Sequence, residues 1–508
     1  MKKNIIKTFA FMFSAMFLAK ILGLVRNIIF ARFYGTGIEA TAFFTASRIP
    51  LQLLDITLGA AISSTFIPVF NEYLKKKGKN RALEFANNFL NVVVMATMLL
   101  TILGIIFAPF IVNTIAPNLG VETYDITVKL SRILFPIMIF TAVAFVFVGF
   151  LQSMDEFNIP AIISVVSNGI LILYLLVFNN KFGIVGVAIA MAIGWLTQVI
   201  VQLPSARKKG FKYSFKIDFK DEGLKKVVKL AGPTLISSWV QPINNIVNLR
   251  LASGLENGAA VSAIEYAYNI YLIVVGVFSY TLSNIVFPEL SKLSAENENE
   301  KLKTIIKNAL QVTALFVIPM SIGIAFLSND IVKIIYERGE FTAQSTCLTA
   351  GALTFYAIGM IGYGIMEILN KVFYAMQDAK TPMITSGIAI ILNIILSVIF
   401  VKFMGYRGLP LAASIVSIIV AGIMLLMTFS RIKLSFEKEN ILEVLKYIVA
   451  GIVLTSILVI VNMFGLGSLV KVIISVLGGM VAYFAILILL KSEMVKYALE
   501  QIKQKIKS

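Results

Sequence analysis

The stretch AKILGLVRNIIFARFYGTG, residues 19–37, decides what kind of fold the sequence encodes. Most of it is apolar enough for a membrane helix, yet Lys20, Arg26 and Arg32 lie within it. A charged side chain near the centre of a bilayer costs about 2.5–3.5 kcal/mol on insertion scales, so such a residue usually faces a partner or a water-filled cavity. The stretch therefore predicts a membrane-embedded protein with a polar interior.

The composition of the whole chain leads to the same prediction. Of 508 residues, 58% are hydrophobic and 14% are charged, and the mean hydropathy is +0.88. Apolar runs of roughly 20 residues recur from end to end, which is the length that an α-helix needs to cross a bilayer core of about 30 Å. We expect an all-α polytopic membrane protein with about 14 transmembrane helices.

Residue counts exclude several kinds of site. With one cysteine, Cys347, and no histidine, the chain cannot form an intramolecular disulfide, a Cys/His zinc site or a histidine general base. The phosphate-binding pattern G-x-x-x-x-G-K-[ST] does not occur either, so transport would run on a gradient, the membrane potential or substrate flux. We expect a transporter and no enzyme, with no cofactor apart from Na⁺ or the membrane potential for coupling.

The cations gather in alternate loops. The net charge is +18, but this distribution indicates membrane topology and no nucleic-acid partner. By the positive-inside rule, the basic side and both termini are cytoplasmic in a multi-pass protein of the bacterial cytoplasmic membrane. The basic side would also attract anionic lipid headgroups non-specifically. The basic loops are 74–82, 206–229, 291–303 and 430–440.

Segments after the longest basic loop repeat those at the start. Residues 29–73 resemble residues 247–293, with Arg32 matching Arg250 and Pro68 matching Pro288. Such a pattern favours two parallel six-helix lobes around a central cavity, with two extra C-terminal helices. The predicted parts are an N-lobe of spans 1 to 6 at 1–205, a basic cytoplasmic linker at 206–229, a C-lobe of spans 7 to 12 at 230–431, spans 13 and 14 at 441–490, and a basic cytoplasmic tail at 491–508.

Three cations in the first half, Lys20, Arg26 and Arg48, are candidates for binding an anionic substrate. Arginine suits phosphate because its planar guanidinium donates parallel hydrogen bonds, and lysine adds a point charge. Asp55 is either an internal counter-ion of these cations or a ligand contact. Arg32 and Arg250 lie near span ends, where they could instead extend to the interface.

The second half offers uncharged polar side chains within its spans. They could line a polar cavity or hold a cation through their oxygens, and hydrogen bonds between helices are the alternative. Asn393 and Ser397 are one helical turn apart on the predicted eleventh span. The other positions are Gln241, Asn244, Asn245, Asn248 and Ser414.

Five motifs occur in an order that resembles the MurJ (MviN-type) lipid II flippases of the MOP exporter superfamily. KILGLVRNIIFARFYGTG is similar to the family's first span, and residues 42–73 are similar to its second span. VQPINNIVNLRLAS with VSAIEYAYN, and then VFPELSK, resemble its seventh and eighth spans. LNKVFYAMQDAKTP, residues 369–382, resembles the end of its tenth span.

The resemblance implies a flippase that moves lipid II, an undecaprenyl-pyrophosphate-linked disaccharide-pentapeptide, from the inner to the outer leaflet by alternating access for cell-wall synthesis. It also implies a cationic cavity containing Lys20, Arg26 and Arg48, and a lipid-tail groove at 441–490. Polar or counter-ion positions of that cavity would be Asn27, Asp55, Gln241, Asn245 and Asn269, and the residues of a weak Na⁺ site would be Asn248, Asn393, Ser397 and Ser414.

Several positions depart from the family pattern. Asn27, Thr41 and Asn248 replace carboxylates, and Leu54 and Asn269 replace arginines that many members carry. These departures leave open a flippase for another polyprenyl-linked glycan. A MATE-like cation or drug antiporter is a further alternative, although the cationic cavity argues against it. The expected partners are the lipid-linked substrate and membrane lipids, and the expected state is a monomer.

Overall fold

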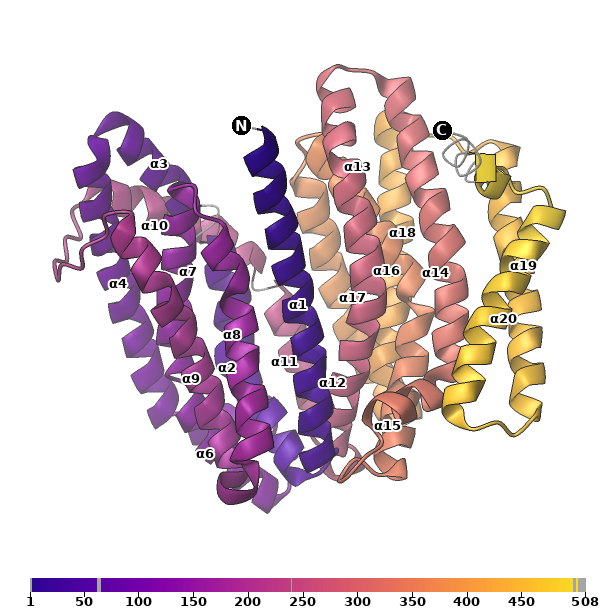
Figure 1. The fold of residues 1–508 in the computed structure, drawn as a ribbon, viewed down its shortest axis with the longest axis horizontal. Coiled ribbons are helices and arrows are strands. Elements are labelled where there is room, and N and C mark those ends of the chain that lie inside the picture. Colours follow the sequence, from indigo (N-terminus) through magenta and orange to yellow (C-terminus); the bar gives the residue numbers. More distant parts are fainter. Residues whose placement is uncertain (1, 62–64, 239, 497–498, 501–508) are drawn as a thin grey trace. The chain divides into compact units, whose positions relative to one another are not determined.

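The computed structural model describes residues 2–61, 65–238, 240–496 and 499–500 (Figure 1). This part of the chain is almost entirely helical and contains no β-strand, which confirms the predicted all-α class. The helices form two compact units, Met1–Ser262 and Ala263–Ser508, called unit 1 and unit 2.

Unit 1 contains the N-terminal helices and continues beyond the basic 206–229 loop. Its elements are α1 (Lys2–Tyr34), α2 (Ile38–Ala61), α3 (Ile67–Lys76), α4 (Gly78–Ile106), α5 (Ala108–Ile115), α6 (Val121–Leu134), α7 (Ile137–Ser153), α8 (Asn158–Val177), α9 (Asn179–Lys208), α10 (Glu222–Ser238), α11 (Val240–Ala252) and the short 3₁₀ helix η2 (Glu256–Gly258).

Unit 2 begins within α12 and runs to the C-terminus. Its elements are α12 (Ala259–Tyr271), the π-helical turn η3 (Leu272–Gly276), α13 (Val277–Ala295), α14 (Asn299–Tyr336), α15 (Ala343–Ile358), α16 (Met360–Ala375), α17 (Lys380–Met404), the 3₁₀ turn η4 (Gly405–Arg407), α18 (Gly408–Ile432), α19 (Lys438–Met463) and α20 (Ser468–Leu489).

The compact units divide the chain later than the sequence repeat does. Helices α10 and α11 belong to the predicted C-lobe, but they pack against α2, α3, α4 and α5 and so fall in unit 1. The predicted lobe boundaries, 1–205 and 230–431, describe the repeat and stay a prediction.

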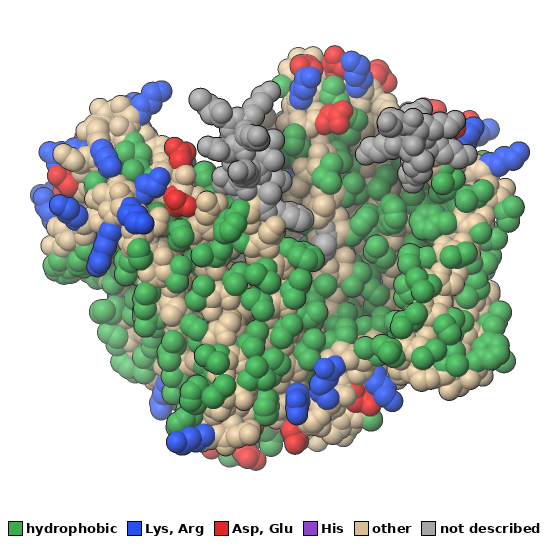
Figure 2. Space-filling view, in the orientation of Figure 1, with side chains coloured by type: hydrophobic (Ala, Val, Ile, Leu, Met, Phe, Trp, Pro, Cys, Tyr) green, Lys and Arg blue, Asp and Glu red, His purple; other side chains and the backbone are tan. Residues whose placement is uncertain are grey.

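Many helices are long and apolar enough to cross a membrane. Among the described residues, ten stretches meet this description, or eleven if the pair α15 and α16, bent by 48° where they meet, forms one span. The stretch Lys380–Ile432 contains two helices, α17 and α18, which pack against each other as a hairpin. In each unit charged side chains gather at the helix ends and apolar side chains lie between them (Figure 2). This is the pattern of a polytopic membrane protein, whereas the total of fourteen spans stays a prediction.

Each unit has a core of its own. In unit 1, α3, α4, α7 and α9 bury a cluster of aromatic rings, among which Phe66 stacks on Phe70, Phe85 and Phe89. In unit 2, α13, α14, α16 and α18 bury a largely aliphatic core. A second cluster in unit 2 joins α14 to α19 and α20.

The motif QDAKTP caps a helix of unit 2. The Asp378 carboxylate accepts hydrogen bonds from the backbone N–H groups of Lys380 and Thr381 (3.0 and 3.1 Å) and from the Thr381 hydroxyl (2.6 Å) at the start of α17. Arg431, at the end of α18, forms an ion pair with the same carboxylate. The Thr381 hydrogen bond is the main cause that lowers the pKa of Asp378, which lies outside the membrane-spanning helices. The cap therefore stabilises the fold above the ordinary aspartate pKa and weakens as pH falls below it.

Helices α16 and α18 approach so closely that glycine is required between them. A Cβ atom on Gly362 would lie 2.6 Å from the backbone nitrogen of Ile418 and 2.6 Å from the backbone carbon of Ser417. Backbone atoms of a packed helix cannot move aside as a side-chain tip can. Small residues at such contacts let membrane helices pack through van der Waals contact.

We predict that Gly362→Ala destabilises the protein by about 1–3 kcal/mol, because the added methyl group overpacks the α16–α18 contact. Gly387→Ala in α17 is the control, since a Cβ there meets nothing within 4 Å. Thermal midpoints measured by size-exclusion chromatography of detergent-solubilised protein compare the two. Equal midpoints for both variants would contradict the close packing.

Candidate functional site

Arg26 lies within α1 and is oriented by two amide side chains. Its Nε and Nη2 donate to Oδ1 of Asn27 (3.2 and 2.9 Å), and its Nη1 donates to Oδ1 of Asn168 on α8 (3.0 Å). The guanidinium is only partly buried. Because amide oxygens carry no net charge, these bonds fix the direction of the guanidinium without cancelling its positive charge.

Asn168 connects α8 to α1 in two ways. In addition to accepting from Arg26, it donates through Nδ2 to the backbone carbonyl of Ala19 on α1 (3.4 Å) and to that of Ser164 on its own helix (2.9 Å). Helices α1 and α8 pack along each other. The position of Arg26 therefore depends on a residue that lies far away in the sequence.

The other predicted cations of unit 1 lie on α1 and α2. Lys20 is exposed on α1, and Arg48 is half-buried on α2. That Lys20 and Arg48 converge with Arg26 at one site stays a prediction. Arg250 is exposed at the end of α11 and donates from Nη1 to the backbone carbonyl of Thr114 (2.6 Å), which favours its structural interpretation.

The uncharged polar positions are spread over several helices. On α11, Asn245 and Asn248 are half-buried. On α12, Asn269 donates to the backbone carbonyl of Glu265 in its own helix (2.9 Å). The side chains of two further predicted residues, Asp55 and Gln241, lie outside the described residues, as does that of Leu54.

Three residues of the predicted Na⁺ site are buried in unit 2. On α17, Ser397 Oγ donates to Asn393 Oδ1 (2.8 Å), and on α18, Ser414 Oγ donates to the backbone carbonyl of Phe355 (2.6 Å). Each side chain thus has a protein partner. No group of three or more acidic, histidine or cysteine side chains that could hold a metal occurs within the described ranges.

A set of polar contacts, the polar latch, joins two short loops of unit 1. Thr41 Oγ1 donates to the carbonyl of Gly258 and lies 3.1 Å from Ser262 Oγ, which also lies 3.2 Å from the carbonyl of Thr36. Gly258 has a φ of +91°, a conformation that glycine adopts without strain. The sequence repeat matched these two loops to each other, and the structure brings them into contact.

In unit 2 polar contacts bind α20 to α14 and join α19 to the segment that follows α20. Lys471 on α20 pairs with Asp330 on α14 (3.0 Å) and donates to Asn462 (2.9 Å). At the opposite end, the buried Glu443 accepts hydrogen bonds from Ser492 and Lys446, while Tyr483 donates to the carbonyl of Leu315 on α14 (3.1 Å). These contacts fix α19 and α20 to the rest of unit 2.

An apolar groove of about 320 Å³ lies in unit 2 between α14, α16, α18 and α19. Residues that line it include Leu310, Ile318, Leu425, Ile441 and Leu445. Its walls suit a hydrocarbon chain, because they present almost no hydrogen-bond donors or acceptors.

Comparison with known proteins identifies the family. The model of the family described as "Lipid II flippase MurJ" matches residues 30–478. The chain belongs to the lipid II flippase MurJ family.

Relatives and solved structures agree with this assignment. A probable lipid II flippase MurJ of Rickettsia prowazekii is 30% identical over 404 residues, which cover 78% of this chain and 79% of the relative. The lipid II flippase MurJ of Burkholderia cenocepacia is 28% identical over 408 residues, covering 78% of each chain.

A solved structure of a lipid II flippase MurJ in an inward closed conformation is similar with a TM-score of 0.82 and 28% identity, over 94% of this chain and 97% of that one. A MATE-family multidrug transporter in an inward-facing conformation shares the fold, with a TM-score of 0.68 and 16% identity over 84% of this chain and 98% of that one. This MurJ-family chain is therefore a multi-pass protein of the bacterial inner membrane, and its family consists of transporters.

The structure gives two departures from the MurJ pattern a physical role. Asn27 accepts two hydrogen bonds from Arg26, so it orients the guanidinium without the charge of a carboxylate. Thr41 bonds two groups of the polar latch. The sequence does not single out Asn168 or the latch residue Ser262, because nothing local marks a contact between distant helices.

We predict that Asn168→Leu lowers the free energy of unfolding by about 1–3 kcal/mol, because it leaves a charged donor on α1 without that acceptor. Thr197→Val is the matched control, since the Thr197 hydroxyl bonds only carbonyls of its own helix. The midpoint of thermal unfolding in detergent measures both. A loss no larger for Asn168→Leu than for the control would show that the α1–α8 bonds do not support the fold.

Proposed function

We propose that this protein translocates lipid II from the inner to the outer leaflet of the bacterial cytoplasmic membrane. Its family membership supports the activity, and the single structural observation that carries it is the oriented guanidinium of Arg26 within α1. The pyrophosphate is the anionic part of the proposed substrate, and a guanidinium binds phosphate oxygens through paired, charge-assisted hydrogen bonds. Lys20 and Arg48 would add positive charge to the same site.

The apolar groove beside α19 would hold the undecaprenyl tail. A polyprenyl chain needs an apolar surface, and the groove lies next to α19, whose N-cap residue Glu437 pairs with Lys307 on α14 (3.1 Å). The charged headgroup and the apolar tail would thus be recognised by separate parts of the protein.

The proposed movement is alternating access, in which the polar latch closes one side. The latch loops carry almost no Lys or Arg, whereas the loops at the opposite helix ends are basic. Under the positive-inside rule the latch side is then the outer side, with both termini in the cytoplasm. Opening of the latch would release lipid II to the outer leaflet.

Coupling to the membrane potential or to Na⁺ completes the proposal. The neutral oxygens of Asn248, Asn393, Ser397 and Ser414 are of the kind that hard cations prefer. The last three already take part in protein hydrogen bonds, so Na⁺ binding would have to replace these bonds. The proposed state is a monomer, and a flippase for a related polyprenyl-linked glycan is the alternative substrate assignment.

We predict that the wild-type chain restores growth to a bacterium depleted of its lipid II flippase, and that Arg26→Ala does not. Removing the guanidinium takes away the donors that would bind pyrophosphate, so transport should fall at least tenfold, as expected for the loss of a charge-assisted bond of about 1.5–3 kcal/mol. Growth is measured at matched membrane expression. Failure of the wild-type chain to restore growth would count against lipid II as the substrate. Rescue by Arg26→Ala would count against the role of Arg26 in binding the pyrophosphate.

We also predict that cross-linking the polar latch stops transport. In a Cys347→Ser background, Thr41→Cys and Ser262→Cys place two thiols where hydroxyl oxygens lie 3.1 Å apart. Oxidation should abolish flipping in the double variant, and a reductant should restore it, while each single variant stays active. Undiminished transport by the cross-linked protein would show that the latch need not open.

A further inference from the structure

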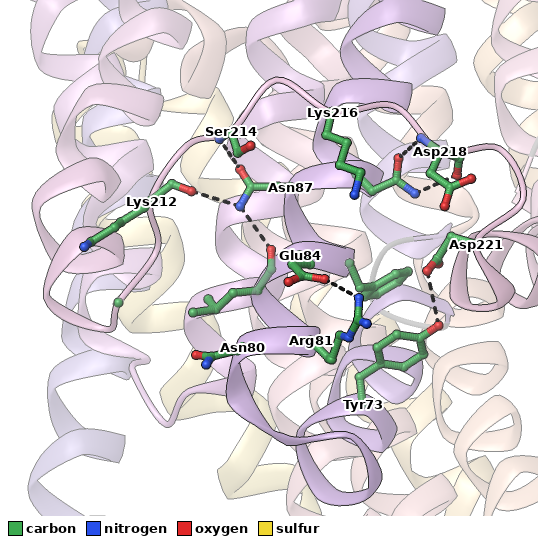
Figure 3. Close-up of a pocket in the computed structure, with 14 residues that line it drawn as sticks. Tyr73, Asn80, Arg81, Glu84, Asn87, Lys212, Ser214, Lys216, Asp218 and Asp221 are labelled. Atoms are coloured by element: carbon green, nitrogen blue, oxygen red, sulfur yellow. Dashed lines mark hydrogen bonds and ion pairs between the residues drawn. The ribbon is translucent and has the colours of Figure 1, made fainter.

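Residues 211–221, called the strap, join α9 to α10 as an extended segment held along α4. Three buried asparagines of α4, Asn87, Asn88 and Asn91, bind its backbone, and Figure 3 shows Asn87 between Lys212 and Ser214 of the strap. Asn87 and Asn88 both donate to and accept from the strap, and Asn91 donates to two of its carbonyls. The bonds are Asn87 Nδ2 to Lys212 O (2.9 Å), Ser214 N to Asn87 Oδ1 (2.9 Å), Asn88 Nδ2 to Asp218 O (2.8 Å), Asp218 N to Asn88 Oδ1 (2.7 Å), and Asn91 Nδ2 to Ser214 O (2.8 Å) and Lys216 O (3.0 Å).

Contacts around the C-terminal end of the strap fix it further. The backbone N–H of Gly223 donates to the Tyr73 hydroxyl (2.8 Å), and Lys226 on α10 pairs with Glu72 on α3. Hydrogen bonds from Lys226 and Lys76 lower the pKa of Glu72 to about 2. A lowered carboxyl pKa stabilises the fold above the ordinary glutamate pKa and ceases to do so as pH falls toward 2, so these ion pairs persist at neutral pH.

The strap exposes three aromatic side chains. Tyr213 is 63% exposed, Phe215 is 79% exposed and Phe219 is 58% exposed. Successive side chains of an extended backbone point to opposite sides. Since Lys212, Ser214 and Lys216 line a pocket between the strap and α4 (Figure 3), Tyr213 and Phe215 lie on the outer side of the strap.

The depth of Phe215 along α4 follows from its anchor. Asn91 binds the carbonyls of the residues on both sides of Phe215, so this ring lies at the level of Asn91. Exposed apolar side chains of α4 begin at Met95, one helical turn or about 6 Å further along. The charged residues of α4 all precede Asn91. Asn91 therefore lies where the apolar membrane span begins, at the level of the lipid headgroups.

The surroundings of the strap are strongly basic. Lys212, Lys216 and Lys220 alternate with the aromatic residues, residues 75–81 contribute five further cations, and residues 207–209 contribute three. Figure 2 shows Lys and Arg side chains gathered over this end of unit 1. Aromatic rings prefer the membrane interface, and lysines beside a membrane are attracted to anionic headgroups.

We propose that the strap is a binding site for anionic phospholipids, in which Tyr213, Phe215 and Phe219 insert among the headgroups and the exposed strap lysines add to the positive charge that attracts these lipids. The pocket beneath the strap, about 400 Å³ in volume, does not select anions by itself, because it is lined by Glu84, Asp218 and Asp221 as well as by cations. The lipid site is the outer, aromatic side. By binding the leaflet there, the strap holds the connection between α9 and α10 at the membrane surface.

The test places a fluorescent reporter on the strap. Phe215→Trp is made in the full-length chain with its two native tryptophans replaced by phenylalanine, and the protein is reconstituted into vesicles. The vesicles contain phosphatidylcholine brominated near the headgroup end of its acyl chains, with or without phosphatidylglycerol. Lys301→Trp, on the exposed first turn of the long α14, is the control.

We expect the emission of Phe215→Trp to shift to shorter wavelength and to be quenched by the brominated lipid, more strongly with phosphatidylglycerol, while Lys301→Trp is unaffected. Emission of Phe215→Trp like that of the control would overturn the proposal and leave the strap open to a soluble partner.

The charge requirement is tested with Lys212→Gln, Lys216→Gln and Lys220→Gln combined. This variant keeps the asparagine bonds, which use only backbone atoms of the strap. In this variant the extra quenching of Phe215→Trp that phosphatidylglycerol causes should be mostly lost. The quenching in vesicles of phosphatidylcholine alone should remain. Unchanged dependence on phosphatidylglycerol would overturn the role of the lysines.

Discussion

The hydrogen bonds that hold the guanidinium of Arg26 within an apolar helix are the constraint on which the proposed function depends. A cation at this depth is costly unless polar groups or water surround it. Asn27 and Asn168 contribute uncharged oxygens to this requirement, so their bonds orient Arg26 without adding a negative charge beside it. A carboxylate in either position would satisfy the same donors and would also compete with an anionic substrate.

The same device, an amide or hydroxyl that binds a distant backbone, recurs at the helix ends. The α4 asparagines hold the strap, and Thr41 binds Gly258 in the polar latch. Between helix ends, packing relies on small residues, as where Gly362 meets α18. Apolar packing between membrane helices gains little from the hydrophobic effect, since lipid tails are equally apolar. Polar contacts therefore add to this packing in holding particular helices together.

Much of the fold could be predicted from the sequence. A segment that crosses the bilayer must form its backbone hydrogen bonds within a helix, and such helices are visible in the sequence as long apolar runs. The helical class, the family and the presence of Arg26 in the first helix all follow from residues 19–37 and the other motifs. Asn168 could not be predicted, since its role arises only when α8 packs on α1. The asparagines of NNFLN in α4 likewise gain a purpose only when the strap lies beside them. The repeat matched the loops of the polar latch but could not show that they touch.

The most direct measurement of the central claim is translocation of fluorescent lipid II by the purified protein in vesicles, detected as headgroup label that becomes accessible to an external quencher. The account predicts translocation by the wild type that undecaprenyl pyrophosphate inhibits and uncharged undecaprenol does not, because the pyrophosphate is the group that Arg26 binds. It predicts loss of translocation in Arg26→Gln, which keeps a polar side chain but no charge. Equal inhibition by both lipids, or full activity of Arg26→Gln, would contradict the account.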